Sequence, residues 1–137
     1  MAIQTFRDLE VYQESYQCAM MVSKLTRTFP QFEQVEIARQ LRRSARSIPA
    51  NIAEGWAKRN SASEFKRFLQ MAIGSCHETH VWLDMSFDEG YFSKDKHHEL
   101  TARYNHIGIM LHKLWKTWRV LAQAPREAST PQELLTS

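Results

Sequence analysis

The sequence has few of the residues that interrupt or cross-link a chain. Its 137 residues include only four glycines, four prolines and two cysteines, too few turn-forming residues for a many-stranded β fold. No apolar run approaches the ~18 residues that cross a bilayer. The first residues also lack the basic and apolar regions of a secretory signal. We therefore expect one all-α domain in the cytoplasm, with no membrane contact.

Signatures of catalysis and metal binding are also missing. Cys18 and Cys76 have no metal-ligand spacing and fit buried, reduced thiols of a cytoplasmic protein. His77 and His80 are three residues apart, whereas two zinc ligands on one helical face are four apart. There is no glycine-rich phosphate loop and no nucleophile elbow. We expect no enzyme activity, no metal and no cofactor.

Apolar periodicity predicts four helices, over about 7–28, 33–58, 61–88 and 93–121. Ser61 and Glu64 form a capping-box pattern at the start of the third, and Ser93 can cap the fourth. Apolar residues of the fourth segment alternate four and three apart, as in the seam of a bundle helix. This seam consists of Leu100, Tyr104, Ile107, Leu111, Leu114, Trp118 and Leu121.

Connections of only a few residues favour antiparallel neighbours, so the predicted architecture is an up-down-up-down antiparallel four-helix bundle. We assign residues 1–123 to this single domain. Residues 124–137 lose the periodicity and are predicted to be a flexible C-terminal tail.

Pro49 lies inside the second predicted helix, where it costs ~3 kcal/mol by deleting one backbone hydrogen bond. One interpretation is a kink near Pro49 that fits this helix to the bundle. The other is a local polar site, because nearby polar residues fall close to the apolar face and need partners if buried. An ion pair between Arg43 and Glu78 would link the second and third helices. We favour a structural network over a catalytic one, with the members Arg43, Asn51, Glu54, Ser75 and Glu78.

Charge is distributed unevenly along the chain. Residues 36–67 carry eight basic and three acidic side chains, net +5, whereas residues 68–92 carry four acids and no Lys or Arg. Arg39, Arg43 and Arg46 share one helical face, and guanidinium groups match phosphate oxygens bidentately. The alternatives are a solvated face or arginines that pair with acids of another subunit. The candidate nucleic-acid contacts are Arg39, Arg42, Arg43, Arg46, Lys58 and Arg59.

Four tryptophans give more aromatic bulk than a small bundle core easily hides. Trp115 lies one position off the seam of the fourth helix, so it can face a neighbouring subunit, and tryptophan is enriched in interface hot spots. We assign Trp56 and Trp115 to a candidate oligomer interface. Core filling is the expectation for Trp82 and Trp118.

Several motifs give the chain a family resemblance over about residues 5–120. The matching features are Phe6-x-x-Leu9-x-x-Tyr12, Phe29-Pro30, Gln40-Leu-Arg-Arg-Ser-Ala45, Ser47-Ile-Pro-Ala-Asn-Ile-Ala-Glu-Gly55, Arg59-x-Ser61-x-x-Glu64-Phe65, Phe68-Leu69-x-x-Ala72-x-Gly74-Ser75-x-x-Glu78 and Gly90-Tyr91. With these motifs the chain resembles the four-helix-bundle proteins called 23S rRNA-intervening sequence proteins. The resemblance implies an up-and-down bundle, a ring of five chains and no established catalytic residue.

A related branch is similar in fold: the accessory variability determinant proteins of diversity-generating retroelements. Its members bind nucleic acid and a reverse transcriptase through a basic pentamer. The leading hypothesis is therefore a non-enzymatic homo-oligomer that contacts the RNA or DNA backbone through an arginine face. The alternative is a protein-interaction scaffold whose arginines serve subunit contacts or an acidic partner.

Overall fold

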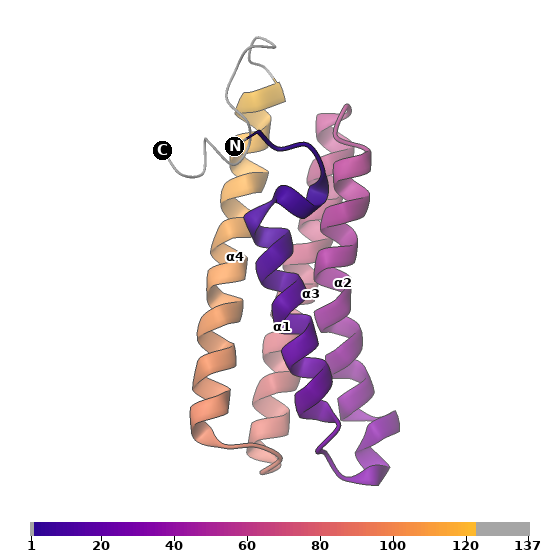
Figure 1. The fold of residues 1–137 in the computed structure, drawn as a ribbon, viewed down its shortest axis with the longest axis vertical. Coiled ribbons are helices and arrows are strands. Elements are labelled where there is room, and N and C mark those ends of the chain that lie inside the picture. Colours follow the sequence, from indigo (N-terminus) through magenta and orange to yellow (C-terminus); the bar gives the residue numbers. More distant parts are fainter. Residues whose placement is uncertain (1, 123–137) are drawn as a thin grey trace.

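Residues 2–122 are described by a computed structural model, and they form an all-helical bundle (Figure 1). The four long helices are α1 (Glu10–Thr26), α2 (Ile37–Ala57), α3 (Ala62–Asp88) and α4 (Lys94–Ala122). Two short 3₁₀ helices, η1 (Phe6–Asp8) and η2 (Gln31–Val35), precede α1 and α2. No strand occurs within the described range. The predicted fold class is confirmed.

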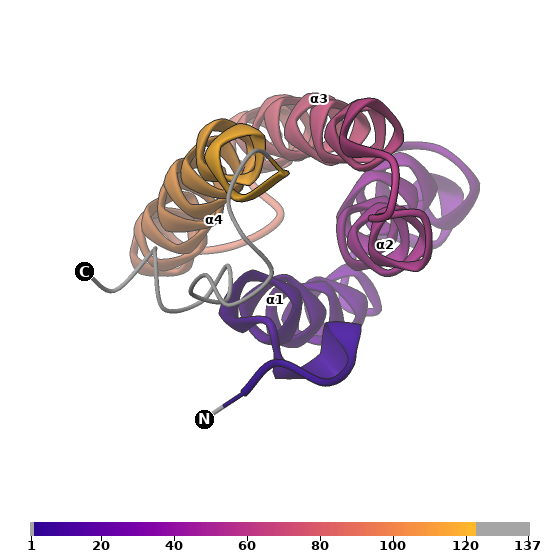
Figure 2. The ribbon, with the colours of Figure 1, turned by 90° about the horizontal axis from the view of Figure 1, so that it is seen from above.

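Each helix packs against the helices before and after it in the chain, and α1 also contacts α4 (Figure 2). Seen from above, α2 and α4 therefore lie at opposite corners of the bundle. This placement leaves one side of every helix free for solvent or partners.

Two helix starts differ from the prediction. Leu9 is extended, with ψ 126°, so α1 begins at Glu10 and the preceding turn is 3₁₀. A capping box between Thr5 and Asp8 closes that turn, and the backbone N–H groups of Thr5 and Gln4 lower the pKa of Asp8. Glu36 adopts φ −115° and ψ −108°, so α2 begins at Ile37 and not near residue 33. Periodicity alone does not locate such local breaks.

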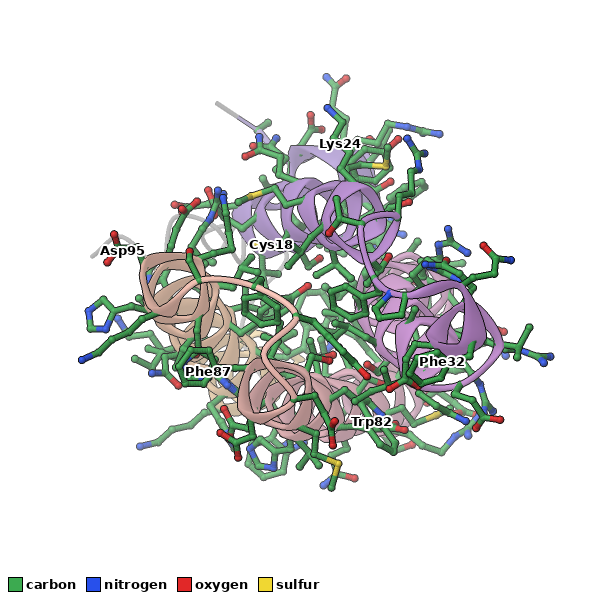
Figure 3. All side chains as sticks on the ribbon, turned by 90° about the horizontal axis from the view of Figure 1, so that it is seen from below. Cys18, Lys24, Phe32, Trp82, Phe87 and Asp95 are labelled. Atoms are coloured by element: carbon green, nitrogen blue, oxygen red, sulfur yellow. The ribbon has the colours of Figure 1, made fainter. Side chains whose placement is uncertain are left out.

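The core follows the predicted apolar faces. In α4, Leu100 through Leu114 of the predicted seam are fully buried, whereas Trp118 is half-buried. Cys18 points into the bundle in Figure 3, while Lys24 and Asp95 point away from it. Cys18 and Cys76 are free thiols, and burial raises the pKa of each to about 11.

The caps of α3 and α4 form as expected. Ser61 Oγ accepts the Glu64 backbone N–H at 3.3 Å, and Ser93 Oγ accepts that of Lys96 at 3.1 Å. The Glu64 side chain pairs with Arg67 at 2.9 Å, so the carboxylate stays within the first turn of α3.

Gly55 sets the distance between α2 and α3. A Cβ at this position would lie 2.7 Å from Phe68 Cβ and 3.0 Å from Phe65 Cδ1. The 2.7 Å approach is closer than carbon atoms tolerate and the 3.0 Å approach is tight, so a side chain here would force α2 and α3 apart. Close packing at this end of the groove between α2 and α3 depends on the missing side chain.

Pro49 lies inside α2 without ending it, because α2 continues to Ala57. Its ring is buried and lines a groove between α1 and α2. A kink at this position stays a prediction. The predicted tail at 124–137 lies outside the described residues. None of the helices described is long and apolar enough to cross a membrane.

Candidate nucleic-acid interface

Three of the predicted arginines lie free on α2. Arg39, Arg43 and Arg46 are exposed and line one groove, together with Arg42, Ser47 and Ala50. Within residues 2–122, these three guanidinium groups have no hydrogen bond or ion pair. Unpaired guanidinium groups keep all their donors for a ligand. We call these three residues the arginine face.

Arg42 has a different role from its neighbours. Its guanidinium donates to Thr26 Oγ1 at 3.0 Å and to Gln34 at the side-chain Oε1 (3.2 Å) and the backbone oxygen (3.0 Å). Burial, followed by the charges of Arg46 and Arg27, lowers the pKa of Arg42. Arg42 therefore fastens the end of α1 and η2 to α2. The structure also adds Arg27 to this basic surface, which the prediction omitted.

Lys58 and Arg59 are distant from the arginine face. At 1.5 Å per residue, the helix places Lys58 about 28 Å from Arg39 along its axis. Arg59 donates to the backbone oxygen of Trp56 at 3.0 Å, and its guanidinium lies 4.4 Å from the Trp56 ring centre. Lys58 Nζ lies 4.8 Å from the Phe68 ring centre. The six predicted contacts thus form two groups.

Two cations of α3 join the second group. Arg67 lies 4.6 Å from the same Phe68 ring centre, and Lys66 Nζ lies 3.9 Å from the Trp115 ring centre. Cation–π contacts fix such side chains while leaving N–H donors free. We call Lys58, Arg59, Lys66 and Arg67 the ring-held cluster. The sequence has basic residues next to aromatic residues around the loop between α2 and α3, and this pattern could have predicted the cluster.

The predicted polar network exists in part. Ser47 Oγ donates to Ser75 Oγ, Thr79 Oγ1 donates to Ser44 Oγ at 3.0 Å, and Asn51 Nδ2 donates to the Ser47 backbone oxygen at 2.8 Å. The first two bonds connect α2 to α3 near Pro49, and the third lies within α2. Ser44 and Thr79 were missed, because their hydroxyl groups fall on positions that resemble ordinary core.

The charged members of that prediction need correction. Arg43, Glu54 and Glu78 are exposed, and no ion pair joins Arg43 to Glu78. Glu78 accepts the indole N–H of Trp82 at 3.2 Å instead. Exposed charges gain little from pairing in water, and the buried hydroxyl groups satisfy one another.

The two candidate interface tryptophans differ in burial. Trp56 is 7% exposed and packs against Phe65 and Trp118, so it belongs to the core and offers little surface to another subunit. Trp115 is half-buried, and its indole N–H has no hydrogen-bond partner among the described residues. Trp115 therefore stays a candidate for an interface.

A second surface feature is an apolar groove between α1 and α2. Tyr16 and Met20 are 50% and 46% exposed on its α1 side, and Arg46 lies at its edge. The remaining lining residues are Phe6, Tyr12, Ala19, Pro49, Ala50 and Ala53. No group of His, Cys, Asp and Glu in the described range could hold a metal ion.

Fold and surface together define a four-helix bundle with an arginine face on one helix. A family model described as 23S rRNA-intervening sequence protein matches residues 7–113. The chain therefore belongs to the 23S rRNA-intervening sequence protein family.

A solved structure supports the fold. It is a protein of unknown function from the S23 ribosomal protein family of Bacteroides thetaiotaomicron. This chain is similar to it with a TM-score of 0.71 at 23% identity, over 77% of this chain and 95% of that one. The comparison with curated proteins gives no match.

Proposed function

We propose that this chain is a non-enzymatic, homo-oligomeric protein of the cytoplasm that binds the backbone of RNA or DNA through its arginine face. The observation that carries this proposal is the three exposed arginines of α2, which have no partner among the side chains that the structure describes. Phosphate contacts of this kind give affinity without base specificity. The resemblance to accessory variability determinant proteins, whose branch binds nucleic acid, agrees with this function.

Assembly would strengthen the contact. Weak phosphate contacts repeated on each chain of a ring add through avidity. A pentamer is our expectation, with Trp115 at a subunit contact and Trp56 contributing at most its small exposed edge. Two buried thiols of raised pKa suit a reducing compartment such as the cytoplasm.

The test is a charge reversal, Arg39→Glu with Arg46→Glu, read by binding of structured RNA and duplex DNA across a salt series. Three neutralised phosphates per chain give a slope of log affinity against log salt of about −2 to −3. We expect the reversal to remove this binding and to leave oligomer mass unchanged. A matched control is Lys94→Glu with Lys113→Glu, the same charge change on α4 at the opposite corner of the bundle. Equal losses in both variants would refute a local site.

The apolar groove between α1 and α2 favours a second candidate, a protein-interaction scaffold. Exposed Tyr16 and Met20 beside Arg46 suit a helix with an apolar stripe and an acidic residue. Under this alternative, the Arg39/Arg46 reversal would change oligomer mass or protein binding, and the wild-type chain would not bind nucleic acid at low salt.

A further inference from the structure

A polar groove runs between α2 and α3 on the side of the molecule next to the arginine face. Ser47, Asn51 and Ser75 form its floor, and Arg43 lies at one end. The other lining residues are Ser44, Met71, Gly74 and Glu78. Arg43 also lines the groove of the arginine face, so the two surfaces are continuous.

Gly74 meets no packing requirement within residues 2–122. It lies in the interior of α3, and a Cβ built there would meet nothing within 4 Å. A glycine at such a position costs roughly 0.5–1 kcal/mol relative to alanine. Gly55, in the facing helix, is required by close packing, whereas Gly74 faces open space at the groove. The surface over Gly74 is therefore accessible to a ligand.

The groove floor offers hydrogen-bond donors. The Ser47 and Ser75 hydroxyl groups are hydrogen-bonded to each other, and in the arrangement in which Ser47 donates, the Ser75 hydroxyl hydrogen is available to a ligand. Asn51 uses one amide hydrogen on the Ser47 backbone oxygen and keeps the second. Both donors are uncharged, like those that commonly contact phosphate oxygens.

Cations stand at both ends of the groove. Arg43 marks the end near the start of α2. At the other end, Lys58 and Arg67 lie over the same Phe68 ring, and Arg67 Nη1 lies 3.8 Å from Sδ of the lining residue Met71. Both cations lie within 5 Å of the Phe68 ring centre, and Glu64, which pairs with Arg67, offsets one of the two charges.

The nearby acids are partly engaged elsewhere. Glu78 lines the groove, but its carboxylate accepts from Trp82 in the next turn of α3. Glu64 is held by Arg67 at 2.9 Å. Glu54 is exposed on α2 and is not part of the groove lining.

From this arrangement we infer that the α2–α3 groove holds one backbone strand of nucleic acid, which runs from Arg43 past Gly74 to Lys58 and Arg67. This inference rests on the proposed function and specifies its ligand. Arg43 and Lys58 are about 22 Å apart along α2 at 1.5 Å per residue. That length corresponds to about seven nucleotides at 3.4 Å per nucleotide of a stacked strand.

Gly74→Leu tests the groove without changing a charge, and Gly74→Ala is the matched control. The probes are single-stranded oligonucleotides of about 3 and about 10 nucleotides, and a duplex of about 10 base pairs, bracketing the seven-nucleotide span. We expect Gly74→Leu to weaken binding of the longer strand at least about tenfold, a loss of about 1.4 kcal/mol. Gly74→Ala should bind within about twofold of wild type, since its single Cβ leaves the groove open.

The ends of the groove are tested by Lys58→Gln with Arg67→Gln. We expect this variant to bind the long strand no better than the short one, because the second anchor is gone. If the duplex binds as the single strand does and responds to both variants, the bound strand comes from a duplex. If only the single-stranded probe responds, the ligand is single-stranded.

Three outcomes would overturn the inference. If the Arg39/Arg46 reversal abolishes binding while Gly74→Leu and Lys58→Gln/Arg67→Gln do not weaken it, the proposed function stands without the groove. A change of oligomer mass in Gly74→Leu would make the groove a contact between copies of the chain. Absence of wild-type binding at low salt would remove both proposals together.

Discussion

The basic residues at the two ends of α2 differ in their contacts. In the first half, Arg39, Arg43 and Arg46 extend into solvent without a partner among the described residues. Just after the carboxyl end, Lys58 and Arg59 lie over aromatic rings, near the cations at the start of α3. The first group is adaptable and the second is already positioned.

The two groups of cations therefore differ in the entropy that they lose when a ligand binds and in the packing around them. Free guanidinium groups lose side-chain entropy when a ligand fixes them, whereas ring-held cations have lost part of it already. Tight packing at the carboxyl end also depends on Gly55, whereas the first half contacts η2 through Arg42. Sequence charge alone does not distinguish the two ends.

Gly55→Ala is the substitution expected to cause the largest loss of unfolding free energy, because it disturbs the packing at the carboxyl end of α2. Its Cβ would approach Phe68 Cβ to 2.7 Å, and Phe68 Cβ cannot rotate away because it is fixed to the backbone of α3. Overpacking of this kind costs about 1–3 kcal/mol, and we expect a value near the upper end. Urea unfolding measures the loss. Gly74→Ala is the control and should be slightly more stable than wild type, so equal losses in both variants would contradict the packing argument.

Arg42→Ala should produce a smaller loss in the other half of α2. It removes the guanidinium that joins Thr26 and Gln34 to α2, so we expect a loss of about 1–2 kcal/mol in unfolding free energy. Arg43→Ala is the matched control, with an expected change within about 0.5 kcal/mol because its side chain is exposed. Binding should show the opposite order, with Arg43→Ala weakening the phosphate contact more. A destabilised Arg43→Ala would show that the free arginines have a structural role.

Glu64→Gln should have the smallest effect, and it should depend on pH. The hydrogen bond and the charge of Arg67, followed by the charge of Lys58, lower the pKa of Glu64 from its ordinary value of 4.5. A lowered pKa contributes stability that is complete above the unfolded pKa and is lost as pH falls through the folded one. Urea unfolding of wild type and Glu64→Gln should therefore differ at pH 7 and converge as pH falls below the ordinary value of 4.5 and through the lowered pKa of Glu64. A difference that persists in acid would indicate a role other than charge.

The fold was largely predictable because its signals are local. Apolar spacing of four and three located the α4 seam, and Ser61 and Ser93 marked the starts of α3 and α4. The start of α1 was placed too early, because the extended conformation of Leu9 leaves no trace in the periodicity.

The candidate site was only partly predictable. Helical spacing placed Arg39, Arg43 and Arg46 on one face, as the structure has them. The internal bonds of Arg42 depend on η2 folding back onto α2, which the spacing does not encode. The expected ion pair of Arg43 with Glu78 failed because both positions lie at an exposed rim.

The sequence by itself determined the four helices, the apolar face of each and the concentration of basic charge in residues 36–67. These properties follow from the helical repeat and from residue type, which act over neighbouring turns. Only the tertiary structure decided which cations stay free and which lie on rings, and why Gly55 and Gly74 differ. The reason is that packing between helices brings together residues far apart in the chain, and their contacts depend on distances of a few ångströms that no local pattern specifies.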